Sequence, residues 1–101
     1  MTLPTQTSED GQVLTIDMPE RFDFDIHADL RKTYKDKDSV SCFVINLGQT
    51  SYLDSSALGM LLQLREHAGN RNDSVKIINA RDSVMEILNV ANFDKMLTIV
   101  H

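Results

Sequence analysis

Two adjacent serines follow an aspartate where an apolar segment changes into an amphipathic one, in the stretch TSYLDSSALGMLL at residues 50–62. Asp54 is of the residue type that caps a helix N-terminus by accepting backbone N–H groups, here from Ser56 or Ala57. The hydroxyls of Ser55 and Ser56 then lie in the first helical turn, which tolerates added negative charge. Solvated serines are common at such positions. A phosphate, which adds a charge of about −1.5 to −2, also suits a hydroxyl placed there.

The helix expected at residues 55–68 separates into two faces when residues are spaced about 100° apart. Its apolar face carries Ala57, Leu61, Leu64 and Ala68, with Leu58 beside it. The opposite polar strip carries Ser55, Gly59, Gln63 and Glu66, with Ser56 close to it and Met60 and Leu62 on its borders. A glycine inside a helix costs roughly 0.8–1.0 kcal/mol relative to alanine, which indicates a close approach by another molecule. We therefore predict a partner-binding surface made of Asp54, Ser55, Ser56, Gly59, Met60, Leu62 and Gln63.

Strand-like and helix-like patterns alternate along the rest of the chain. Strands are expected at residues 13–18, 41–47, 75–79 and 96–100, with a short edge strand at 3–7 because of Pro4. Helices are expected at residues 25–36 with Asp25 as N-cap, and at 82–91 with Ser83 and Glu86 as a capping box. The continuous apolar run at 41–47 predicts a central strand buried on both faces. This order predicts an α/β fold with a mostly parallel sheet of four to five strands and helices packed against it.

Length and composition predict one domain spanning residues 1–101. The net charge of −5 argues against nonspecific binding to nucleic acid. Cys42 is the single cysteine, so no disulfide can form within the chain, and this favours a reducing compartment. The chain has no segment long and apolar enough for membrane insertion and no signal-peptide pattern at its start. We expect a cytoplasmic protein.

Catalysis is the first alternative, with Ser55 as nucleophile and His27 or His67 as base. The chain has no G-x-S-x-G pattern, and His67 lies about three helical turns beyond Ser55, out of reach. Cys42 and the three histidines, His27, His67 and His101, do not have the spacing typical of metal ligands. The chain also lacks a glycine-rich phosphate-binding loop. We therefore predict no enzymatic activity, no metal and no cofactor.

The stretch INLGQTSYLDSSALGMLLQLREHA resembles the strand, loop, D-S-S/T-G-L-G motif and helix of a STAS domain of the anti-sigma factor antagonist type. Weaker agreement extends to RFDFDIHADL and MEILNVANFDKMLTI, although Ala57 stands where many members have glycine. The resemblance implies that Ser55 is phosphorylated by a partner serine kinase, often an anti-sigma factor with a histidine-kinase-like ATP fold. It implies that a PP2C-type phosphatase reverses the modification, and that the unphosphorylated form binds the partner.

Ser56 is a second candidate for the modification. Some STAS domains instead serve as unmodified subunits of transport or signalling assemblies, docking through the same helix.

Overall fold

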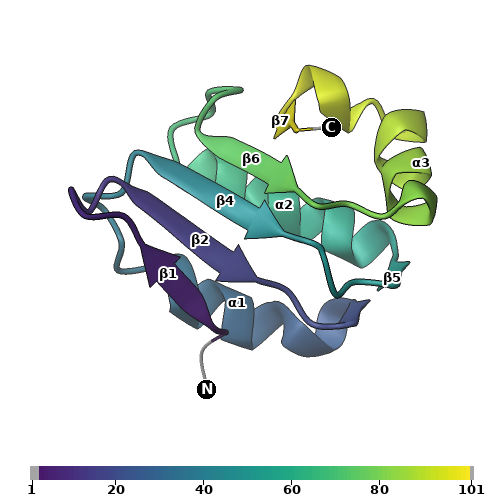
Figure 1. The fold of residues 1–101 in the computed structure, drawn as a ribbon, viewed down its shortest axis with the longest axis horizontal. Coiled ribbons are helices and arrows are strands. Elements are labelled where there is room, and N and C mark those ends of the chain that lie inside the picture. Colours follow the sequence, from purple (N-terminus) through teal and green to yellow (C-terminus); the bar gives the residue numbers. More distant parts are fainter. Residues whose placement is uncertain (1–2, 101) are drawn as a thin grey trace.

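Five strands form the main sheet in the order β1-β2-β4-β6-β7 (Figure 1). They are β1 (Thr5–Thr7), β2 (Val13–Asp17), β4 (Cys42–Asn46), β6 (Val75–Ile78) and β7 (Thr98–Ile99). The computed structural model describes residues 3–100. Neighbouring strands pair in parallel, except that β1 is antiparallel to β2. The predicted α/β fold with a mostly parallel sheet is confirmed.

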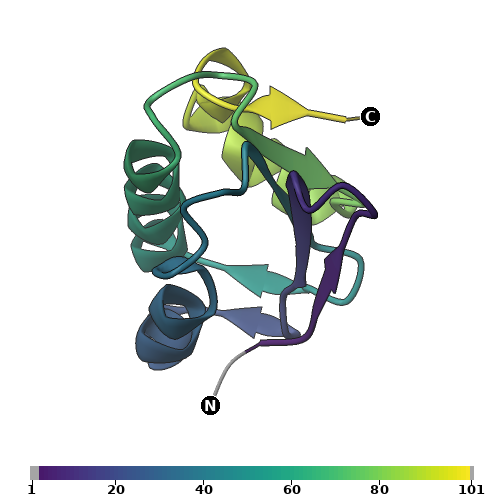
Figure 2. The same cartoon turned by 90° about the vertical axis from the view of Figure 1, so that its left-hand side faces the viewer.

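Within residues 3–100, three α-helices and two short 3-10 helices connect the strands. They are η1 (Phe24–Ile26), α1 (His27–Tyr34), α2 (Ser55–His67), α3 (Asp82–Val90) and η2 (Phe93–Lys95). Helices α1 and α2 lie next to each other on one face of the sheet, and α3 lies beyond the carboxyl end of β6 (Figures 1 and 2). Within the described residues, no helix has the length and apolar character needed to span a bilayer.

Burial alternates along the inner strands of the sheet. Phe43 and Ile45 of β4 are fully buried, whereas Cys42, Val44 and Asn46 between and beside them are only half-buried. Strands β2 and β6 alternate in the same way. The prediction that the strand at 41–47 is buried on both faces is therefore wrong. A continuous apolar run is fully buried only where helices cover both faces, and α1 and α2 cover one (Figure 2).

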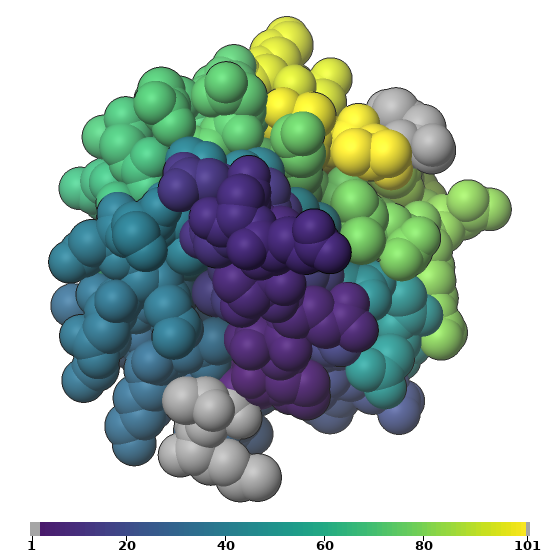
Figure 3. Space-filling view, turned by 60° about the vertical axis from the view of Figure 1, so that its left-hand side comes forward, coloured from purple at the N-terminus to yellow at the C-terminus, as the bar shows by residue number. Residues whose placement is uncertain are grey.

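The edge strand β1 is exposed along its length, and it crosses the surface in the space-filling view (Figure 3). Pro4 precedes it, and the Pro4 carbonyl accepts the backbone N–H of Asp17 at 2.9 Å. The predicted edge position is confirmed. Proline has no N–H to donate to a neighbouring strand, but its carbonyl can still accept one from β2, which suits an edge strand.

A second, two-stranded sheet joins β3 (Arg21–Phe22) to β5 (Tyr52–Leu53) in parallel, and sequence analysis did not predict it. Phe22 and Leu53 pair with each other and are buried, while the pair Arg21 and Tyr52 faces outward. Strands of two residues are too short to show a periodicity of two. This small sheet ties the segment before α1 to the segment before α2.

Two predicted helix caps are wrong, although α3 starts at residue 82 as predicted. Asp23, not Asp25, supplies the cap before α1, because its carboxylate accepts the backbone N–H of Asp25 at 3.0 Å at the start of η1. Helix α3 begins at Asp82, and its N-cap position is Arg81, which makes no side-chain cap hydrogen bond. Ser83 therefore lies inside the helix, where it cannot form the predicted capping box with Glu86.

Candidate functional site: the start of helix α2

Asp54 is the N-cap of α2, as predicted. Its Oδ1 atom accepts the backbone N–H groups of Ser56 at 3.1 Å and Ala57 at 3.2 Å. The same oxygen accepts the Ser56 hydroxyl at 2.5 Å, and Oδ2 accepts the Tyr52 hydroxyl at 3.3 Å. Both carboxylate oxygens are thus engaged, and together they hold the first turn of the helix.

These donors lower the pKa of the Asp54 carboxyl below its ordinary value of 3.8. The Ser56 hydroxyl contributes most, followed by the backbone N–H of Ala57, the Tyr52 hydroxyl and the backbone N–H of Ser56, while burial opposes them. Hydrogen bonds donated to a carboxylate stabilise its charged form. Asp54 is therefore an anion at neutral pH, one residue before Ser55.

The two serines differ in their surroundings. Ser56 is half-buried and its hydroxyl is committed to Asp54. Ser55 is exposed, and its hydroxyl donates no hydrogen bond to any of residues 3–100. Ser55 is thus the more accessible hydroxyl, and Ser56 acts in the cap.

The polar strip of α2 lies at the surface, as the helical spacing indicated. Ser55, Gly59, Leu62 and Gln63 are exposed, and a Cβ atom added to Gly59 would meet nothing within 4 Å. Met60 is different: its side chain is 4% exposed and lies in the core. Its predicted place in the partner-binding surface is wrong, because it lies three residues after Ala57 and four before Leu64, on the buried side with both.

An apolar groove opens between α2 and α3, which sequence analysis did not find. It has a volume of about 350 Å³ and is lined by Leu58, Ser83, Glu86, Ile87, Val90 and Ala91. Val90 is 79% exposed. Leu58 is one helical turn from Ser55, so the groove continues the surface that carries the serine. The sequence signal was Val90, an apolar residue that does not share a helix face with the buried Val84 and Leu88.

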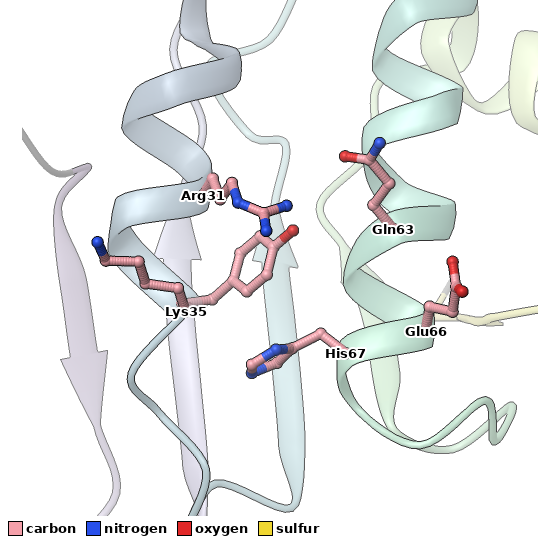
Figure 4. Close-up of a pocket in the computed structure, with 6 residues that line it drawn as sticks. Arg31, Lys35, Gln63, Glu66 and His67 are labelled. Atoms are coloured by element: carbon pink, nitrogen blue, oxygen red, sulfur yellow. The ribbon is translucent and has the colours of Figure 1, made fainter.

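A separate cleft of about 500 Å³ lies between the C-terminal ends of α1 and α2 (Figure 4). Arg31 and Lys35 border it from the α1 side, and Gln63, Glu66 and His67 from α2 (Figure 4). Tyr34 lies between them, 4.9 Å from the His67 ring, and burial raises the pKa of its hydroxyl. Cations near helix C-termini are stabilised by the helix dipole, which accounts for Arg31 and Lys35 here.

The histidines do not assemble with Ser55. His67 is the last residue of α2, whereas Ser55 is the first, and the His67 ring packs on Tyr34 and Phe43. His27 stacks on Phe24 with 5.0 Å between ring centroids. In the part of the chain that the structure describes, no three His, Cys, Asp or Glu side chains gather where they could hold a metal ion.

The fold and the capped serine pair define a class: a single α/β sheet domain with an aspartate-capped serine pair at the start of one helix. The family model described as Mlab, STAS domain, matches residues 5–99, and the chain belongs to this family. A STAS-domain containing protein of Pseudomonas aeruginosa (strain UCBPP-PA14) is 42% identical over 101 residues, covering 98% of this chain and 99% of the relative.

Solved structures with the same fold include those of the anti-sigma factor antagonist SpoIIAA. SpoIIAA in its unphosphorylated form has a TM-score of 0.76 at 14% identity, covering 97% of this chain and 89% of that one. SpoIIAA of Bacillus in its phosphorylated form has a TM-score of 0.66 at 13% identity, covering 99% and 92%. The protein TM1081 of Thermotoga maritima has a TM-score of 0.78 at 16% identity, covering 99% and 81%.

Proposed function

We propose that this protein is a phosphorylation-controlled binding switch of the anti-sigma factor antagonist type, acting in the cytoplasm. Unphosphorylated, it binds a partner anti-sigma factor or serine kinase with a histidine-kinase-like ATP fold. Phosphorylation of Ser55 releases the partner, and a PP2C-type phosphatase restores binding. The switch needs no catalytic residue or cofactor of its own, since ATP belongs to the kinase.

The observation that carries this proposal is the exposed Ser55 hydroxyl beside an ionised Asp54. A phosphate on Ser55 would place about −1.5 to −2 charges next to an existing carboxylate. A partner that accommodates the neutral hydroxyl would have to desolvate that charge or leave. Each 1.4 kcal/mol lost reduces affinity tenfold, so a modest penalty is enough to switch binding.

The surface offered to the partner is the polar strip together with the apolar groove. The strip contributes Ser55, Gly59 and Gln63, together with Asp54, Ser56 and Leu62 beside it, and the groove contributes Leu58, Ile87 and Val90. An interface core of this kind combines apolar anchors with a polar rim. That SpoIIAA has been solved in both an unphosphorylated and a phosphorylated form supports the same role here.

The test measures affinity for the cognate partner with wild type, Ser55→Ala, Ser55→Asp and the control Ser39→Asp. Ser39 is an exposed serine in the loop between α1 and β4, outside the surface offered to the partner. We expect the Ser55→Ala protein to bind at least as well as wild type and the Ser55→Asp protein to bind worse. The Ser39→Asp protein, which carries the same added charge elsewhere, should bind like wild type. Equal binding by wild type and both Ser55 variants would discard the switch.

The alternative is an unmodified STAS subunit of a transport or signalling assembly. The apolar groove between α2 and α3 favours it, because a permanent subunit also needs an apolar docking surface. Incubation with the cognate kinase and ATP, followed by intact-mass measurement, separates the two functions. A single phosphate on Ser55 supports the switch, and an unmodified chain supports the subunit.

A further inference from the structure

Arg21 is the cation that the tertiary structure connects to the start of α2. In the small sheet, Arg21 is paired with Tyr52 across β3 and β5. Its guanidinium carbon lies 4.1 Å from the centroid of the Tyr52 ring, and its Nε atom donates to Asp23 Oδ2 at 3.2 Å. The side chain is 64% exposed. The Asp23 side chain is only 15% exposed, but the guanidinium itself faces solvent, so it can exchange its acceptor without first leaving a buried site.

Tyr52 brings this guanidinium close to the serine pair. The Tyr52 hydroxyl donates to Asp54 Oδ2 at 3.3 Å, and Ser55 is the next residue. Arg21 and Asp54 are therefore linked through Tyr52 by two successive contacts. Sequence spacing alone gives no such proximity, since Arg21 and Tyr52 lie in different segments that only the β3–β5 pairing joins.

We propose that Arg21 binds the phosphate on Ser55 within the same molecule, exchanging Asp23 for the phosphate. The inference rests on the proposed function, which supplies the phosphate. A guanidinium offers paired N–H donors that match two phosphate oxygens, and such bonds are stronger than those to a single neutral acceptor. The phosphate also carries more charge than the Asp23 carboxylate, and Asp54 adds to the negative potential there.

This exchange extends the switch to the segment before α1. Arg21 at present pairs with Asp23, whose other carboxylate oxygen caps η1. When the guanidinium moves to the phosphate, β3 and the first turn of α2 are joined by an ion pair. The phosphorylated surface then carries an ion pair between Arg21 and the phosphate on Ser55. This pair is absent from the unmodified chain that the kinase binds, and it offers a phosphatase a feature to recognise.

Arg81 is the matched control. It also lies at the carboxyl edge of the main sheet, where its Nε atom donates to the Gly48 carbonyl at 3.3 Å. Arg81 and Arg21 carry the same charge and the same donors, but Arg81 makes no contact with Tyr52 or Asp54 among the interactions of residues 3–100. A general effect of charge at this edge would therefore appear in both arginine variants.

The experiment uses the full chain with phosphoserine incorporated at position 55 during translation, and follows the phosphate by ³¹P NMR over a pH titration. The second pKa of phosphoserine is about 6. An adjacent cation favours the dianion, so we expect Arg21→Gln to raise that pKa by about 1 unit relative to the unsubstituted phosphoprotein. Arg81→Gln should leave it unchanged, and Arg21→Lys, which keeps the charge, should restore most of the lowering.

An unchanged titration in Arg21→Gln, or an equal shift in Arg81→Gln, would overturn the proposal. Circular dichroism of each variant checks the fold, and Arg21→Lys keeps the test decisive if the glutamine variant is unstable. The titration needs neither kinase nor partner. If no kinase phosphorylates Ser55, the proposed function is refuted, but the ³¹P titration of the phosphoserine protein is unaffected. If the Arg21→Gln substitution does not change the phosphate pKa, this inference fails, but the partner affinities of the Ser55 variants still test the proposed function.

Discussion

The hydroxyl of Ser56 donates a 2.5 Å hydrogen bond to the Asp54 carboxylate, and this contact gives the two neighbouring serines different roles. It engages the hydroxyl of Ser56 in the helix cap and lowers the pKa of Asp54. Ser55, one residue earlier, stays exposed beside an anion. The consequences of this division can be measured on the isolated protein and in partner binding.

Replacing Ser56 by alanine should destabilise the protein, whereas replacing Ser55 should not. The Ser56→Ala protein loses a hydrogen bond to a charged acceptor, so we expect its unfolding equilibrium constant to rise by about fivefold. The Ser55→Ala protein loses only an exposed hydroxyl and should stay within about 0.5 kcal/mol of wild type. Urea denaturation monitored by circular dichroism measures both. A larger loss in Ser55→Ala would reverse the assigned roles.

Asp54 should contribute a pH-dependent part of the stability. Because its pKa is lower in the folded chain than the ordinary value of 3.8, its contribution is present above that value and is lost as pH falls through the folded pKa. We therefore expect the stability advantage of wild type over Asp54→Asn to shrink on acidification below pH 3.8. Urea midpoints at pH 7, 5, 4 and 3 test this.

Asp10 titrates in the same range, because the Ser8 hydroxyl and then the Gln12 backbone N–H lower its pKa too. Asp10→Asn is the control: it should remove a separate part of the pH dependence and leave the Asp54 part intact. An Asp54→Asn protein with the full acid dependence of wild type would contradict the assignment.

Gly59→Ala should stabilise the fold. The added Cβ meets nothing within 4 Å, and alanine favours the helix by roughly 0.8–1.0 kcal/mol over glycine. If the partner backbone comes close at Gly59, the same variant binds the partner more weakly although it is more stable. Thermal unfolding and partner affinity, measured on one preparation, separate these effects. A destabilised Gly59→Ala protein would show that the helix surface is not open there.

Met60 and Leu62 should behave in opposite ways. Truncating the buried Met60 to alanine should cost about 2–5 kcal/mol of stability, because it leaves a cavity in the core. Leu62 is 38% exposed, so Leu62→Ala should cost less than about 1 kcal/mol and weaken partner binding instead. Denaturation and partner titration of the two variants form a matched pair. Weak binding by a folded Met60→Ala protein, with normal binding by Leu62→Ala, would restore Met60 to the interface.

Local rules predicted much of this protein correctly from the sequence. The order of the helices and of the strands of the main sheet, the edge position of the first strand and the Asp54 cap depend on residues close together in the chain. Capping and periodicity act over one or two turns, so they are readable without the fold. The motif around Asp54 and Ser55 also indicated the family, which the match over residues 5–99 confirms.

Tertiary structure decided everything that depends on pairing between distant segments. The β3–β5 sheet joins two-residue strands about thirty positions apart, too short to show a pattern, and it alone places Arg21 over Tyr52. β4 is covered on one face because of where α1 and α2 pack, which composition does not reveal. The burial of Met60, by contrast, already follows from its helical spacing to Ala57 and Leu64. Local preferences determine which segments form helices and strands; only the packing of the whole chain determines which of their side chains remain at the surface.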